Sequence, residues 1–289
     1  MKFLDVKTDY AFKKVFGSEQ SHAILISFLN AMIHFNHDLK ITSLEIVDPY
    51  NIPMLKGMKD SYVDVKARLE DESLVIIEMQ VLNHQGFEKR VLYNAAKNYS
   101  IQLQKSEDYH LLNPVIALNI VDFIMFEDSD KITSNFKLLE KEEFIHYSDD
   151  IELIFIELPK FKKSLAELQT AQDKWIYFLQ NAGNLDFIPE QIQLEIKQAL
   201  EIANEANFSY EELEIQHKQK DFIYILKNSI ELAFQKGFKQ GFEEGFVKSQ
   251  VVINAYKVGL DISLIATISG LTETKVNDII HTFNEHHHS

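Results

Sequence analysis

Hydrophobic and polar residues follow two different patterns along this chain. In roughly the first 160 residues, short helical patterns alternate with apolar runs of strand length, whereas helical periodicity continues from about residue 164 to the C-terminus. The predicted order is two helices, a strand, a hairpin, a helix and two more strands, followed by helices alone. This order favours an α/β or α+β first domain and an all-helical second part.

The individual elements follow from the same pattern. Helices are predicted at 9–17, 21–34 and 87–105, and strands at 41–50, 61–69, 74–82, 113–126 and 144–161. The two runs that flank the acidic tip EDES (70–73) predict a hairpin. The run at 113–126 is apolar on both faces, which is typical of a central strand.

Glycine and phenylalanine repeat in KGFKQGFEEGF (236–246), where each glycine lies four residues from the next and precedes a phenylalanine. On a helix this spacing makes a glycine stripe beside an aromatic stripe. Each helical glycine costs about 1 kcal/mol relative to alanine, so packing against a partner must compensate. We expect close helix–helix contact between copies of the chain; a frayed connecting helix is the alternative.

Residues 251–283 have the rhythm of a helix–turn–helix, with predicted caps at Asp261 and Thr272 and a turn at Gly270. Such tails read DNA in some proteins, but a small helical cap is commoner, and no recognition helix rich in arginine is present here. We therefore divide the chain into a domain at 1–162, a helical region at 163–248 and a small tail at 249–285.

Composition excludes several classes of protein. The 289 residues contain no cysteine, which excludes disulfides, thiolate metal sites and cysteine nucleophiles. The sequence has neither an apolar run of membrane-spanning length nor a signal-peptide pattern at its start, so we expect a cytoplasmic protein. The net charge of −15 argues against a surface coated for nucleic acid. Residues 1–125, however, carry 13 basic against 16 acidic side chains, so the first part is far less repulsive to DNA.

Two carboxylates lie inside the strand-like runs of the hairpin, where an unpaired charge is costly to bury. Glu78 and Gln80 are two residues apart and share a face of their strand. If 69 paired with 74, Asp64 would oppose Met79 and would lie on the other face from Glu78. Bringing Asp64 beside Glu78 requires a one-residue offset at the EDES tip. From spacing alone, two surface acids are the simpler interpretation.

An ordered set of motifs favours a functional site over two surface acids. The set comprises DYAFKKVFG (9–17), Asp64, IEMQ (77–80), RVLYNAAKNYSIQL (90–103), DY (108–109) and NPVIALNIVDF (113–123). In this order it resembles the PD-(D/E)XK nuclease family transposases. The resemblance covers about residues 3–160 and extends more loosely into the tail.

The resemblance implies a restriction-endonuclease-like domain, in which helices flank a mixed sheet. It also implies that this domain cleaves DNA with Mg²⁺ or Mn²⁺. It makes Asp64 and Glu78 metal-binding catalytic acids, and it places Gln80 where the wider superfamily has a lysine. Asp9 matches an additional metal-binding acid that some members carry on an N-terminal helix. Because glutamine is neutral, a mechanism in which a lysine polarises the attacking water is in doubt.

Four cations are candidate contacts to DNA phosphates, although for any single one of them solvated surface charge is the simpler interpretation. They are Lys13, Lys66, Arg90 and Lys97. Arg90, Tyr93 and Tyr99 also match family positions on the helix after the active strand, where they brace the site or contribute to the core.

The leading hypothesis is therefore a Mg²⁺-dependent DNA endonuclease linked to recombination or mobile elements, homo-oligomeric through its C-terminal helices. The alternative is a catalytically weak nuclease fold that serves as a DNA-binding or oligomeric interaction module.

Overall fold

The computed structural model describes residues 1–35, 40–51 and 61–287. They fall into two units, Met1–Ile223 and Tyr224–Ser289. The helices of the first unit are α1 (Asp9–Phe16), α2 (His22–Met32), α3 (Phe87–Ser100), α4 (Ala171–Asn181) and α5 (Leu194–Ile202). Its strands are β1 (Leu44–Val47), β2 (Tyr50–Asn51), β3 (Ser61–Tyr62), β4 (Val65–Leu69), β5 (Leu74–Gln80), β6 (Val115–Val121), β7 (Thr133–Leu139) and β8 (His146–Glu157).

A six-stranded mixed sheet forms the centre of the first unit, in the order β1-β4-β5-β6-β8-β7. Strands β5, β6 and β8 run parallel, and the outer pairs are antiparallel. Helix α3 connects β5 to β6, as parallel neighbours require a crossover. Strands β2 and β3 form a separate two-stranded sheet.

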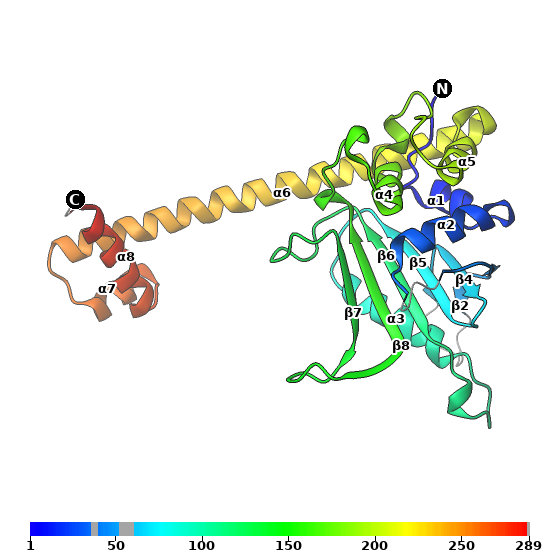
Figure 1. The fold of residues 1–289 in the computed structure, drawn as a ribbon. Helices are drawn as coiled ribbons and strands as arrows, with labels where there is room; N and C mark the ends of the chain where they lie inside the picture. The colour runs from blue at the N-terminus through cyan, green and yellow to red at the C-terminus, as the bar shows by residue number, and fades with distance from the viewer. Residues whose placement is uncertain (36–39, 52–60, 288–289) are drawn as a thin grey trace. The chain divides into compact units, whose positions relative to one another are not determined.

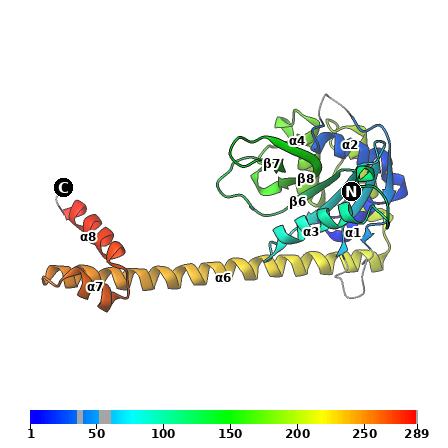
Figure 2. The ribbon, with the colours of Figure 1, turned by 90° about the horizontal axis from the view of Figure 1, so that it is seen from below.

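Helices cover both faces of the large sheet. Helices α2 and α4 lie on one side of the strands and α3 on the other (Figures 1 and 2). The thicker core lies on the α2 side, where Trp175 is fully buried with its ring centroid 5.4 Å from that of Phe28 and 5.8 Å from that of Phe16. Alternation along β5 separates the faces: Val75 and Ile77 join this core, whereas Leu74 and Ile76 pack under α3.

The predicted elements are confirmed with shorter bounds, except that the predicted strand 61–69 divides into β3 in the small sheet and β4 in the large one. The expected mixed sheet with flanking helices is present. Strand β7 was not predicted. It is an edge strand whose positions are all half-buried or exposed, and its residues TSNFKLL include Ser, Asn and Lys. A strand that buries so little carries no strong apolar signal in its sequence.

Helices α4 and α5 follow residue 163 and yet share the core of the sheet through Trp175, Phe178 and Ile196. The unit extends to residue 223, which includes the first turns of helix α6 (Tyr210–Lys257). A separately folding domain at 1–162 stays a prediction.

The second unit contains the rest of α6 together with α7 (Ile262–Ser269) and α8 (Glu273–His287). The Asp261 carboxylate accepts from the Leu264 N–H at 3.0 Å, and Gly270 ends α7 at a φ of +66°. These caps confirm the helix–turn–helix rhythm. Among the described residues, no helix combines the length and apolar character that crossing a lipid bilayer requires.

Candidate active site

The hairpin of β4 and β5 has the one-residue offset that the acidic pair demands. Val65 pairs with Ile77 and Arg68 with Leu74. The Leu69 N–H donates to the Ser73 carbonyl at 2.9 Å, which closes a tip of three residues, and Glu72 takes a left-handed φ of +67° within it. An odd-numbered tip shifts the pairing by one residue, so the expected offset is confirmed.

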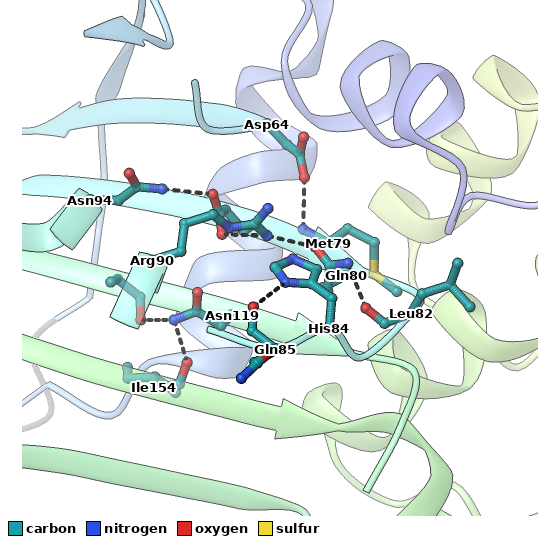
Figure 3. Close-up of polar contacts among 12 residues, drawn as sticks. Asp64, Met79, Gln80, Leu82, His84, Gln85, Arg90, Asn94, Asn119 and Ile154 are labelled. Atoms are coloured by element: carbon teal, nitrogen blue, oxygen red, sulfur yellow. Dashed lines mark hydrogen bonds and ion pairs between the residues drawn. The ribbon is translucent and has the colours of Figure 1, made fainter. Parts of the chain in front are cut away.

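Asp64 lies directly before β4 and is tied to β5 on both sides of Glu78. Its backbone N–H donates to the Ile77 carbonyl at 3.1 Å, and its carboxylate Oδ2 accepts from the Met79 N–H at 2.7 Å (Figure 3). Because β4 begins only at Val65, the Met79 N–H lies beyond its pairing register, and the side chain supplies the acceptor. Asp64 is thereby fixed next to Glu78.

Helix α1 brings two further charges to Asp64. Lys13 Nζ lies 2.7 Å from Asp9 Oδ1 and 3.6 Å from Asp64 Oδ1. Burial, together with the neighbouring Asp9 carboxylate, raises the pKa of Asp64 to about 7, against the opposing effects of the Met79 N–H and Lys13. Asp9, assigned by resemblance alone, is thus beside Asp64.

Glu78 and Gln80 both point toward α3, as their spacing predicts. Asn94 Nδ2 donates to Glu78 Oε1 at 2.9 Å, and Arg90 Nη2 lies 3.5 Å from Oε2. Burial raises the pKa of Glu78, although the Arg90 charge and the Asn94 amide counteract it. Glu78 Oε2 is buried without a hydrogen bond from the described residues.

Both polar ends of the Gln80 amide are engaged. Arg90 Nη2 donates to its Oε1 at 2.6 Å, and its Nε2 donates to the Leu82 carbonyl at 2.7 Å (Figure 3). A single Arg90 side chain therefore contacts both Glu78 and Gln80. This arrangement holds the neutral amide in one orientation.

The four cations predicted to contact DNA have different surroundings. Lys13 and Arg90 lie at the carboxylates, while Lys66 is half-buried on β4, where burial lowers its pKa. Lys97 is only 5% exposed, with Nζ 5.9 Å from the centroid of the Tyr93 ring. Its position on the inner side of α3 gives no support to a phosphate contact.

Sequence reasoning missed Asn94, which orients Glu78. Arg90, Asn94 and Asn98 are spaced four apart, so they form a polar stripe on the side of α3 that faces the sheet. Asn94 and Asn98 are both buried, and their Oδ1 atoms lack hydrogen-bond partners among the described residues. Their spacing relative to Arg90 is the signal that could have revealed them.

The donor set fits a divalent cation. Within the described ranges, no ready-made group of three metal-ligating side chains is found. Asp64 and Glu78 nevertheless offer hard carboxylate oxygens at adjacent positions, and buried Glu78 Oε2 has no hydrogen bond. Mg²⁺ and Mn²⁺ prefer oxygen ligands and commonly need only one or two protein carboxylates, because water and phosphate oxygens complete the shell.

Comparison with known proteins agrees with the motif order. No curated protein and no solved structure matches the chain. The model of the PD-(D/E)XK nuclease family transposases matches residues 6–233, which include the sheet and every residue of the candidate site. The chain therefore belongs to the PD-(D/E)XK nuclease family transposases.

Proposed function

We propose that this protein is a DNA endonuclease that hydrolyses phosphodiester bonds with Mg²⁺ or Mn²⁺ held by Asp64 and Glu78, with Asp9 beside them. The observation that carries the proposal is the attachment of Asp64 to β5 on either side of Glu78. A buried acid and a half-buried acid held together at a strand end are costly for stability, and a cation would offset that cost.

The side chains divide the work of such a site. A bound Mg²⁺ or Mn²⁺ would lower the pKa of a coordinated water and offset negative charge on the phosphate. Asn94 donates to Glu78 Oε1, so Oε2, which has no hydrogen bond but lies 3.5 Å from Arg90 Nη2, would be the oxygen that holds the cation, while the Met79 N–H fixes Asp64. In the reaction, water adds to phosphorus and one P–O ester bond breaks, which leaves one end with a phosphate and the other with a hydroxyl.

A second candidate function is a catalytically weak nuclease fold kept for DNA binding or assembly. The surroundings of Gln80 favour it, since a neutral amide with both ends engaged cannot act as a base. The net charge of −15 favours the assembly role of this candidate, because it opposes DNA binding.

Plasmid cleavage separates the two functions. Purified protein is incubated with supercoiled DNA and Mg²⁺, Mn²⁺ or EDTA, beside Asp64→Asn and Glu78→Gln. Glu88→Gln is the matched control, because Glu88 is an exposed acid on α3. Cleavage that needs metal and both site acids supports the enzyme, whereas equal nicking by all variants, or none with any metal, rejects it.

We further propose that copies of the chain associate through α6. Four phenylalanines along it are between 58% and 69% exposed, namely Phe234, Phe238, Phe242 and Phe246. A Cβ added at Gly237, Gly241 or Gly245 would meet nothing within 4 Å in the described chain. An aromatic and glycine face of this length matches a second helix in close packing.

A further inference from the structure

Position 80 has no charge to offer a reacting phosphate. Gln80 is neutral, and its amide is bound by Arg90 and the Leu82 carbonyl. Arg90 in turn directs Nη2 toward Gln80 and Glu78, and its Nε is buried without a hydrogen bond among the described residues. The cation on the α3 side of the site, the Arg90 guanidinium, is thus already engaged by protein groups.

Helix α1 supplies a cation from the opposite side. Lys13 Nζ lies 3.6 Å from Asp64 Oδ1, and its side chain is 42% exposed, so the ammonium group is at the acid and also open to solvent. Buried Phe12, Val15 and Phe16 anchor the helix that carries it. The next residue, Lys14, turns away, with Nζ 5.8 Å from the Tyr10 ring centroid and 5.7 Å from that of Phe208.

Structural stabilisation is a weak explanation for this placement. The Lys13–Asp9 pair is an i,i+4 pair with side chains 42% and 64% exposed, and such surface pairs add little to stability. A general contact to the DNA backbone would not require the ammonium group to lie at a buried acid. Lys13 instead combines access to substrate with contact to Asp64.

We infer that Lys13 is a catalytic residue of this site: its ammonium group donates to a non-bridging oxygen of the scissile phosphate and supplies the positive charge that position 80 lacks. The inference rests on the proposed nuclease function. The group acts by stabilising negative charge on the phosphate as water adds, and it transfers no proton. A preorganised donor of this kind typically contributes about 10²–10³-fold to the rate.

The test compares Lys13→Gln, Lys13→Arg, Lys14→Gln and the double variant Lys13→Gln/Gln80→Lys in the full chain. Single-turnover cleavage of plasmid DNA gives the rate, and fluorescence anisotropy with Ca²⁺ gives the Kd for DNA. Calorimetric titration with Ca²⁺ alone gives cation affinity, and thermal melts confirm folding.

We expect Lys13→Gln to lower the rate by about 10²–10³-fold while the Kd for DNA changes less than about threefold. Lys13→Arg keeps part of the rate, Lys14→Gln keeps all of it, and the double variant recovers at least about tenfold because a lysine at 80 returns the charge. Lys13→Gln also binds Ca²⁺ more tightly, because a competing charge beside Asp64 and Asp9 is gone.

Three results overturn the inference while leaving the proposed nuclease intact. They are an unchanged rate in Lys13→Gln, a weaker Kd for DNA at an unchanged rate, and a faster rate, which would make Lys13 a competitor of the cation. Failure of the unaltered protein to cleave DNA with any metal rejects the proposed function, and this inference with it. The unaltered protein therefore distinguishes the two failures.

Discussion

Asp64 is joined to Met79 by a hydrogen bond in which the Met79 N–H donates to the carboxylate Oδ2 at 2.7 Å. The bond spans from the residue before β4 to the end of β5, so it fixes the candidate catalytic acid through the backbone of the strand that carries Glu78. Substitutions at Asp64 can therefore separate the effect of its hydrogen bond to Met79 from the effect of its charge.

Asp64→Asn keeps an acceptor for the Met79 N–H but removes a charge that is buried beside Asp9. We expect the variant to be more stable than the unaltered protein in EDTA by about 1 kcal/mol, or roughly 2–4 °C in Tm, because the folded state no longer buries that charge. Ca²⁺ should raise the Tm of the unaltered protein and leave that of the variant nearly unchanged. Asp64→Ala is the control that also loses the acceptor. A lower Tm for Asp64→Asn than for Asp64→Ala would contradict this account.

Asn94→Ala removes the donor that holds Glu78 Oε1. Loss of a side chain that orients a metal ligand typically costs about 10–100-fold in metal affinity or activity, and we expect a decrease of that size in Ca²⁺ affinity. Asn98→Ala is the matched control, since Asn98 is equally buried one turn further along α3. Equal losses of Ca²⁺ affinity in the two variants would show that the effect arises from general damage to α3.

Acid should weaken the contact between Tyr10 and Glu212. The Tyr10 hydroxyl donates to Glu212 Oε1 at 2.6 Å, and this bond, with the Ser209 N–H and hydroxyl, lowers the pKa of Glu212 to about 2. A depressed pKa in the folded state stabilises the protein above the unfolded value of about 4.5, and the stabilisation is lost as pH falls toward 2.

Urea unfolding at pH 7, 5, 4 and 3 measures this effect. Glu212→Gln should be less stable than the unaltered protein at pH 7 and 5, and the difference should shrink at pH 4 and 3. Glu211→Gln, a neighbour on the same turn, is the control. A difference that stays constant from pH 7 to 3 would exclude the link to Glu212.

Phe238→Ser with Phe242→Ser tests association through α6. Both side chains are 67% exposed, so their removal should leave the fold intact while it removes apolar area from the proposed helix contact. We expect light scattering after size exclusion to show an oligomer for the unaltered chain and a monomer for the double variant. Gln240→Ser, between the two positions, is the control. A monomer in every case rejects the proposal.

The sequence predicted the parts of the fold that bury apolar surface. The hairpin offset followed from the functional interpretation of the two acids, because placing Asp64 beside Glu78 requires either a bulge or an odd-numbered tip, and the structure has the odd-numbered tip. Strand β7 escaped prediction, since a partly polar edge strand has no strong pattern.

Side-chain partners were harder to foresee. Asparagine in a helix signals neither charge nor burial by itself, so only its four-residue spacing from Arg90 could have indicated Asn94, which directs Glu78. Lys97 was predicted as a candidate contact to a DNA phosphate, with solvated surface charge as the alternative; the structure buries it along α3. The rotation of α1 against the sheet decides whether Lys13 or Lys14 faces the acids. Sequence alone does not define that rotation.

The Asp64–Met79 hydrogen bond also occupies a backbone donor at an open strand edge. The pairing of β4 with β5 ends where Val65 meets Ile77. The last residues of β5, after Ile77, pair with β6 on one side and with no strand on the other within the described chain. Open strand edges invite pairing with another chain, and a charged side chain turned onto such an edge prevents it. We therefore expect the loss of Asp64 to leave the Met79 N–H open to intermolecular β-pairing, as well as to remove a candidate metal ligand.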